Sequence, residues 1–331
     1  MFCLLIQFIS AGKILENLDA LAGSIAYLHC EDGRNDTPPL TIVTASVDSI
    51  DMTRSVPPDA DLKLSGFVSH VGSSSMEISM KVETVPDGEI ILSALFTMVA
   101  RNPVTYKAES VNRLVVESAE EKEIFNAAAE RKESKQVARQ MELTKRPPSV
   151  EEMYLIHNMY LSNRSIDASH LPDDVVCMKD AKQQSLVMCM PQDRNIHNNI
   201  FGGYLMRLAF ELAYSTAMMY TRSPRVSLVA MDDVLFRRPV PIGSLLSLTA
   251  QVVYSSPEDD TFQLRVRADV VDPIEDLRET TNTFSFGFYA PDGAIRKVVP
   301  QSYEESMLYL EGRRASQKMV ARRKDTVGDI V

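Results

Sequence analysis

The sequence lacks the residue clusters that mark several classes of protein. It has only four cysteines, Cys3, Cys30, Cys177 and Cys189, without a CxxC pair or a His/Cys ligand set, so we expect no zinc site. Reduced thiols in an intracellular compartment are the simplest interpretation. Acidic residues outnumber basic ones, 45 to 35, and the formal net charge is −10. This balance argues against a nucleic-acid partner, because binding to phosphate backbones requires clustered Lys and Arg.

Long apolar runs are also missing. Residues 1–9 are apolar apart from Gln7, but this run is too short to span a bilayer and no basic segment precedes it. It also lacks the Arg-rich and Ser-rich composition of a mitochondrial transit peptide. The sequence therefore predicts no integral membrane segment and shows no clear targeting signal. With 331 residues, 45% of them hydrophobic and 24% charged, the chain is long enough for two globular domains.

The main organising feature is an internal repeat with a constant spacing of 184 residues. Three pairs of identical residues keep this spacing: Asp48 with Asp232, Pro57 with Pro241, and Leu64 with Leu248. Two copies of one unit indicate a duplicated two-domain protein, since a solenoid needs three or more repeats. Because Asp48 and Asp232 recur at matching places, we expect them to share a structural role.

Each copy has the same order of expected elements. A helix comes first, then a strand that contains Asp48 or Asp232, and then strands in which apolar and polar residues alternate. The expected helices are 12–28 and 202–220, and the later strands include 76–82, 90–99, 262–268 and 281–289. The second helix is apolar on nearly all sides, which predicts that it is buried. A helix packed on an antiparallel sheet is an α+β fold.

The segment 191–203 carries the strongest functional signal. Its polar residues lead into Gly202-Gly203, which opens the second buried helix. Glycines let another backbone or a ligand come close, and the N–H groups at a helix start favour negative charge. This geometry suits an oxyanion hole. A tight turn with close packing is the alternative explanation of the glycine pair.

Beyond this loop, several motifs resemble the double-hotdog acyl-CoA thioesterases, and the resemblance covers nearly the whole chain after residue 11. The motifs are FGGYLM at 201–206, DDV at 232–234, RPVPIGS at 238–244 and SYEESMLYL at 302–310. The resemblance implies two tandem hotdog domains, each a buried helix wrapped by a curved antiparallel sheet. It implies hydrolysis of fatty acyl-CoA to free fatty acid and CoA, with CoA as part of the substrate and no cofactor or metal. It also implies a homo-oligomer of double-hotdog chains and a mitochondrial location, while the missing transit peptide leaves a cytoplasmic location open.

The repeat and the resemblance together divide the chain into segments. We expect a first hotdog domain at 11–117, which is N-terminally incomplete because no leading strand precedes it, and a second one at 174–312. Between them, 118–173 is expected to be a helical linker with capping boxes at Ser118-x-x-Glu121 and Ser149-x-x-Glu152. The basic and then polar segment 313–331 is expected to be a flexible tail.

The resemblance also assigns catalytic positions. Asn195 stands seven residues before Gly202, where the family has a catalytic Asn, and Asp19 falls on the family's helix Asp when the two helices are aligned at a spacing of 191. The counterpart of Asp19 in the second copy is Phe210, which does no acid–base chemistry. We therefore expect one composite site, in which Asn195 and the backbone N–H of Gly203 polarise the thioester carbonyl. Asp19 acts there as general base or as nucleophile, and the sequence does not separate these roles.

The apolar neighbours of Asp19 support this assignment, because an unpaired carboxylate in an apolar helix is costly and typical of functional sites. The alternative is that Asp19 lies on an exposed stripe with Glu16. For CoA, the resemblance implies contacts from the polar turn Gly72-Ser73-Ser74-Ser75, and Arg237 and Arg238 are candidates for binding its phosphates. Solvated charges at a strand end are the alternative interpretation of the two arginines. A structural role is likewise the alternative to catalysis for His197.

Two other functions remain open from the sequence. A hotdog hydratase needs an Asp/His pair, but the histidine nearest to Asp19 on its helix is His29, roughly 15 Å away along the axis. A non-catalytic acyl-CoA-binding or scaffold protein of the same fold is the second alternative, because the sequence before Gly12 departs from the family.

Overall fold

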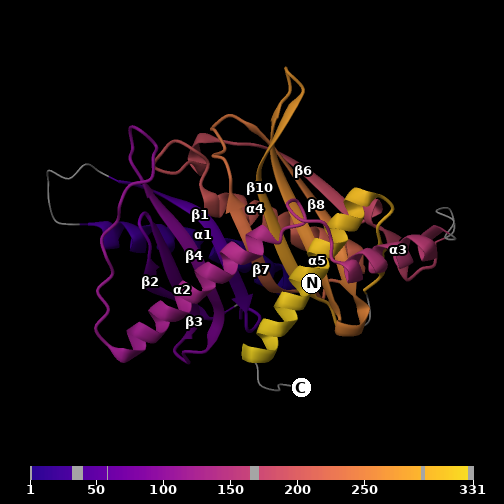
Figure 1. The fold of residues 1–331 in the computed structure, drawn as a ribbon, viewed down its shortest axis with the longest axis horizontal. Helices are drawn as coiled ribbons and strands as arrows, with labels where there is room; N and C mark the ends of the chain where they lie inside the picture. The colour runs from indigo at the N-terminus through magenta and orange to yellow at the C-terminus, as the bar shows by residue number, and fades with distance from the viewer. Residues whose placement is uncertain (1, 32–39, 58, 165–170, 292–294, 327–331) are drawn as a thin grey trace.

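The computed structural model describes residues 2–31, 40–57, 59–164, 171–291 and 295–326. Its centre is a nine-stranded antiparallel sheet with the strand order β2-β3-β4-β1-β7-β10-β9-β8-β6 (Figure 1). The strands are β1 Thr41–Met52, β2 Asp61–Val71, β3 Ser75–Val85, β4 Ile90–Arg101, β6 Lys182–Met188, β7 Ser227–Phe236, β8 Leu245–Ser256, β9 Thr261–Asp272 and β10 Leu277–Tyr289. A separate parallel pair joins β5 Val175–Cys177 to β11 Lys297–Val299.

The sheet order is nearly a mirror of itself about the pairing of β1 with β7. Ser46 pairs with Leu235, and Asp51 pairs with Ala230. Adding the repeat spacing of 184 to Ser46 gives Ala230, and adding it to Asp51 gives Leu235, so each pair is the image of the other. The two copies therefore meet at a local twofold axis between β1 and β7, and they form one continuous sheet.

The two helices predicted to be buried lie side by side on one face of this sheet. They are α1 Phe2–Cys30 and α4 Gly202–Thr221, and they contact each other as well as the strands behind them. Leu15, Leu18, Ala22 and Ala26 of α1 are buried, as are Ala209, Ala213 and Ala217 of α4. Small side chains at one-turn intervals let each helix lie close to the sheet. A helix on an antiparallel sheet, present twice in tandem, is the α+β double-hotdog arrangement, so the predicted fold class is confirmed.

The opposite face of the sheet is covered by two further helices, α2 Ala119–Gln140 and α5 Tyr303–Thr326 (Figure 1). Both begin with the same capping box. Ser118 accepts a hydrogen bond from the Glu121 N–H at 3.1 Å, as predicted, and Ser302 accepts one from the Glu305 N–H at 3.1 Å. These two boxes are 184 residues apart. The repeated unit is therefore longer than the predicted domains: a helix, four strands and a covering helix.

The covering helices also pack on the sheet through matched ring pairs. His70 of β2 stacks on Phe125 of α2 with ring centroids 4.7 Å apart, and Tyr254 of β8 meets Tyr309 of α5 at 5.1 Å. The repeated aspartates each bind a cation from the covering helix of their own half, Asp48 from Lys135 and Asp232 from Arg322. The structural role expected for the repeated aspartates is therefore to fasten these helices to the sheet.

The C-terminal segment differs from the prediction of a flexible tail over 313–331. Helix α5 continues to Thr326, and Ser316 and Met319 within it are buried. One side of this helix lies against β8, β9 and β10, and two of its basic residues, Arg314 and Arg322, form ion pairs with Glu152 and Asp232. Residues 327–331 of the predicted tail lie outside the described residues. In the linker, the second capping box is also present, since Ser149 and Glu152 exchange hydrogen bonds at the start of α3, Val150–Arg164.

Candidate active site

Asp19 is the buried acid at the centre of the candidate site. Its side chain lies on α1 and is 2% exposed. The Thr44 hydroxyl donates a hydrogen bond to Oδ1 at 2.7 Å, and the Gly203 backbone N–H donates one to Oδ2 at 2.6 Å. Burial raises the pKa of the carboxyl from 3.8 to about 6, and the two hydrogen bonds oppose this shift because they favour the charged form. The alternative of an exposed stripe shared with Glu16 is therefore wrong for Asp19.

Gly202 and Gly203 allow the start of α4 to approach α1 closely. A Cβ on Gly203 would lie 2.8 Å from the backbone oxygen of Glu16 and 2.9 Å from its Cα, closer than real contacts permit. A Cβ on Gly202 would lie 3.0 Å from Oδ2 of Asp19. The close packing that was the alternative explanation of the glycines is present. It also brings a backbone N–H of the helix start, where such groups lack partners within the helix, onto the carboxylate of the other half.

Asn195 lies in the loop before α4 and is half-buried. Its side-chain oxygen accepts hydrogen bonds from the backbone N–H groups of His197, at 2.9 Å, and Asn199, at 3.1 Å. Because the carbonyl side of the amide is turned into the loop, the amide Nδ2 is the group that Asn195 presents elsewhere as a donor.

This loop of the second half lies along α1 of the first half. The ring Nε2 of His197 is 3.3 Å from the hydroxyl of Tyr27, which also accepts a hydrogen bond from the Ile42 N–H at 3.1 Å. Tyr27 follows Asp19 by two helical turns, so the loop contacts α1 at two points, through His197 at Tyr27 and through Gly203 at Asp19. His197 therefore acts as an anchor of the loop, which is the structural role that was its alternative.

The hydrogen bonds of Asp19 among the described residues come from Thr44 and Gly203, and neither His197 nor His29 provides one. His29 instead contacts the backbone oxygen of Asn112 at 2.9 Å, near the end of α1. An Asp/His pair of the kind that a hydratase needs is therefore not formed at Asp19. Sequence reasoning missed Thr44, and no motif marks it, since it belongs to β1 and meets Asp19 only in the folded chain.

The equivalent position in the other half is filled by aromatic rings. Phe210 is 1% exposed and packs against Tyr214 and Phe286, with ring centroids 5.9 and 6.2 Å away. The charges also differ between the halves, because Glu16 and its counterpart Arg207 form an ion pair at 3.3 Å between α1 and α4. The two halves thus bring a carboxylate to one of the two related positions and a phenyl ring to the other.

The predicted CoA-binding residues fall in two separate places. The turn Gly72–Ser75 lies near the C-terminal end of α1: Val111 bonds to Ser73 at 3.1 Å, and the adjacent Asn112 exchanges hydrogen bonds with His29. A Cβ on Gly72 would lie 3.0 Å from the Lys132 amine, so a cation adjoins this turn.

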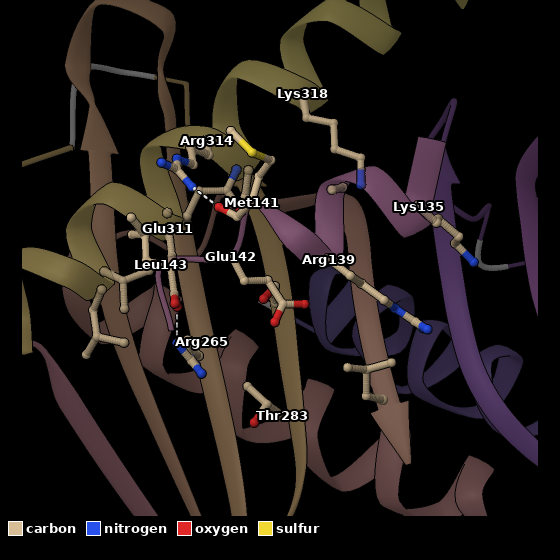
Figure 2. A pocket seen from close by; sticks show the side chains of 18 of the residues that line it. Lys135, Arg139, Met141, Glu142, Leu143, Arg265, Thr283, Glu311, Arg314 and Lys318 are labelled. Atoms are coloured by element: carbon tan, nitrogen blue, oxygen red, sulfur yellow. Dashed lines mark hydrogen bonds and ion pairs between the residues drawn. The ribbon is translucent and has the colours of Figure 1, made fainter. Parts of the chain in front are cut away.

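Arg237 and Arg238 lie on the segment that follows β7. Arg238 forms an exposed ion pair with Glu279. Arg237 lines a cavity of about 440 Å³ on the face of the sheet that α2 and α5 cover, opposite the face on which α1 carries Asp19. In Figure 2, Arg139 and Lys135 reach this cavity from α2, and Lys318 and Arg314 reach it from α5. The structure therefore does not bring Arg237 together with Asp19 or with the Gly72–Ser75 turn.

Two negative findings apply to the part of the chain that the structure describes. It contains no group of three or more His, Cys, Asp or Glu side chains arranged to hold a metal ion. None of its helices is long and apolar enough to cross a membrane.

The double-hotdog fold indicates the class of the protein, and comparison with known proteins shows it. The chain matches the family model of the thioesterase superfamily over residues 7–91 and 197–268, one segment in each half. It is 42% identical over 316 residues to human mitochondrial acyl-coenzyme A thioesterase 9, covering 93% of this chain and 71% of that protein. It is 38% identical to the chloroplastic acyl-coenzyme A thioesterase 2 of Humulus lupulus, covering 91% of this chain and 72% of that protein. The chain belongs to the acyl-coenzyme A thioesterase family.

The solved structures that are similar to this chain include an acyl-CoA hydrolase from Staphylococcus aureus in complex with butyryl-CoA, CoA and CoA disulfide. It is 25% identical, aligns with 46% of this chain and 94% of its own, and has a TM-score of 0.43.

Proposed function

We propose that this chain hydrolyses fatty acyl-CoA to free fatty acid and CoA at one site built from both halves. The observation that carries the proposal is the Asp19 carboxylate, buried on α1 of the first half and hydrogen-bonded by the Gly203 N–H of the second. A buried acid is costly for folding, and such perturbed groups are concentrated at functional sites. Membership of the acyl-CoA thioesterase family supplies the reaction class.

In the proposed reaction, Asp19 acts as general base. It takes a proton from water, whose oxygen attacks the thioester carbon. The resulting tetrahedral intermediate collapses, the C–S bond breaks, and the CoA thiolate leaves with the proton from Asp19. With a pKa of about 6, the carboxyl is mostly ionised at pH 7 and still basic enough to accept a proton. Direct attack by the carboxylate on the thioester carbon is the other form of the proposal.

The developing oxyanion needs hydrogen-bond donors, which commonly contribute a large part of the rate of acyl transfer. Asn195 is suited to this role because its Oδ1 is held by the loop backbone and its Nδ2 is left as the donor. The Gly203 N–H donates a hydrogen bond to Asp19. When Asp19 accepts a proton its negative charge disappears, and we propose that this N–H then bonds the oxyanion.

The contacts with CoA belong to the same proposal. The Gly72–Ser75 turn with Lys132 adjoins the end of α1 that the Asn195 loop contacts, so it is placed to meet the CoA end of a substrate bound at Asp19. Arg237 lies on the opposite face of the sheet, so its use by CoA would require a substrate that extends to another surface of the molecule. Arg238 is paired with Glu279.

The location and assembly are proposed from relatives and from the form of the sheet. Three relatives that are 39 to 42% identical carry mitochondrial names, and we propose the same compartment for this chain. We also propose a homo-oligomer of double-hotdog chains, because β2 and β6 are the two edges of the sheet and exposed edges commonly pair.

The domains are proposed as 11–140 and 174–326, so that each includes its covering helix.

The test is thiol release from a panel of acyl-CoA esters by the full chain, Asp19→Ala and Asn195→Ala. The control is Gln192→Ala, which removes an exposed amide from the same loop. We expect each site variant to lose on the order of 10²–10⁴ in rate, whereas the control stays near the parent. A parent that binds acyl-CoA without turnover would instead identify a binding protein, and site variants with parental rates would remove Asp19 or Asn195 from the mechanism.

A further inference from the structure

One position beside Asp19 has space that no side chain fills. Asp19, Gly23 and Tyr27 are four residues apart in sequence, so they lie on one face of α1. The loop of the second half contacts the first of them through Gly203 and the last through His197. Among the described residues, no heavy atom other than those of the adjoining α1 backbone and chain neighbours lies within 4 Å of a Cβ built on Gly23. The loop thus contacts α1 on both sides of Gly23, and the position between these contacts is an open gap.

A glycine in the middle of a helix needs an explanation, because it destabilises the helix relative to alanine. The other half provides a direct comparison. At the helix spacing of 191, the counterpart of Gly23 is Tyr214, just as the counterpart of Asp19 is Phe210. Tyr214 is 9% exposed, and its ring packs against Phe210 and Phe288 with centroids 5.9 and 6.3 Å apart. The half that has the carboxylate thus keeps open a position that the half without it fills.

The exposure of these positions indicates which part of a substrate would cross the gap. Asp19 is 2% exposed, whereas Gly23, one turn or about 6 Å further along the axis, is partly exposed. The phosphates of an acyl-CoA stay in water, because burying unpaired charges is costly. The uncharged thiol arm of CoA must then connect the solvent with the thioester at Asp19. The polar turn Gly72–Ser75 adjoins the same end of α1.

We propose that Gly23 forms the floor of the passage through which the thiol arm of an acyl-CoA reaches Asp19, and that it is a substrate-binding residue of this site. The proposal rests on the thioesterase function proposed above. It assigns to Gly23 contact with the part of the substrate that all acyl-CoA esters share. A side chain at position 23 would then obstruct every ester to a similar degree, whatever the length of its acyl chain.

The experiment compares the full chain with Gly23→Ala, Gly23→Leu and Ser24→Leu, using butyryl-CoA and octanoyl-CoA as substrates. Ser24 is exposed on the adjacent side of α1, so its variant adds the same side chain outside the passage. We expect Gly23→Leu to lower kcat/KM by a factor of about 10² for both esters, since misplacement of a bound substrate by 1 Å can cost that much. Gly23→Ala should show a smaller loss together with a higher Tm, and Ser24→Leu should stay within about twofold of the parent, because surface substitutions usually have small effects.

The outcomes separate this inference from the proposed function. If the parent hydrolyses both esters and Gly23→Leu matches it, the gap is not used and the inference is wrong. If the loss is much larger for octanoyl-CoA than for butyryl-CoA, the acyl chain and not the thiol arm lies over Gly23, and the assignment is overturned. The folded state of Gly23→Leu is checked by its circular dichroism, and Gly23→Ala tests the same passage if the leucine variant does not fold. An inactive parent would count against the proposed function itself.

Discussion

Replacement of Asp19 by asparagine should remove activity and make the protein more stable. Asparagine has the same shape, and its oxygen can still accept the hydrogen bond from the Gly203 N–H. Burial raises the pKa of Asp19 from 3.8 to about 6, which is a shift of about two units. At 1.36 kcal/mol per unit, the folded protein at pH 7.5 carries a cost of about 3 kcal/mol for keeping this carboxylate ionised. A neutral amide does not have this cost.

The pH dependence of the gain follows from the same pKa values. Between pH 4 and pH 6 the folded protein holds a proton on Asp19 that the unfolded chain has lost, so the stability of the parent falls as the pH rises through this window. Well above pH 6 the full cost is present and stays constant. The advantage of Asp19→Asn should therefore be near zero at pH 4 and reach its maximum above about pH 6.5.

Thermal unfolding of both proteins at several pH values between 4 and 8 measures this effect. For a chain of this length unfolding in one transition, 3 kcal/mol corresponds to a rise in Tm of about 4 °C. Asp87→Asn, which neutralises an exposed carboxylate in the turn between β3 and β4, is the control and should show little change. Equal Tm values for Asp19→Asn and the parent at pH 7.5, or a gain that is the same at pH 4 and pH 7.5, would refute the argument that burial of an ionised Asp19 destabilises the fold.

Two further predictions concern the neighbours of this carboxylate and its counterpart. Thr44→Val removes a hydrogen bond that lowers the pKa of Asp19. In a pH–rate profile, the acid limb of kcat/KM should therefore move to higher pH by on the order of one unit. If the limb does not move, it belongs to the titration of another group. Phe210→Leu should leave turnover near the parental rate while lowering the free energy of unfolding by about 1–3 kcal/mol, because the ring is buried among Tyr214 and Phe286. Thiol release and denaturant titration test this pair of effects, and a large loss of turnover would contradict a single working site.

The repeat carries most of the fold prediction, because identical residues 184 apart give both halves the same order of strands. The repeat also extends beyond the predicted domain boundaries. Ser118 and Glu121 recur as Ser302 and Glu305 at the same spacing, although the sequence pattern places α2 in a linker and the end of α5 in a tail. For α2, the physical reason is that it presents little apolar surface. In α2, the buried residue is Ala128, and the contacts with the sheet include ion pairs such as Lys135 with Asp48.

Thr44 shows what alternation alone does not predict. In a regular strand, Thr44, Ser46 and Asp48 would all face the same side of the sheet. The register of β1 against β4 shifts between Thr44 and Ser46, which marks a bulge. Thr44 consequently turns toward Asp19 on the α1 side, while Asp48 meets Lys135 on the α2 side. The sequence has no glycine or other signal at this bulge, so the third residue around the carboxylate is evident only in the folded chain.

The duplication explains why a single site is compatible with so symmetric a sheet. In a dimer of identical hotdog units, a residue at the position of Glu16 would face its own copy across the helix pair, and two equal charges there would repel each other. In one chain with two copies, the positions evolve separately, and Glu16 pairs with Arg207 instead. Separate evolution also lets Phe210 and Tyr214 fill the related position in the second half with apolar contacts, which stabilise the helix pair. In the first half, the carboxylate of Asp19 stays buried although its burial is costly. On this argument, restoring an aspartate at position 210 would not by itself create a second site, because the ring of Tyr214 still occupies the place that Gly23 leaves open in the first half.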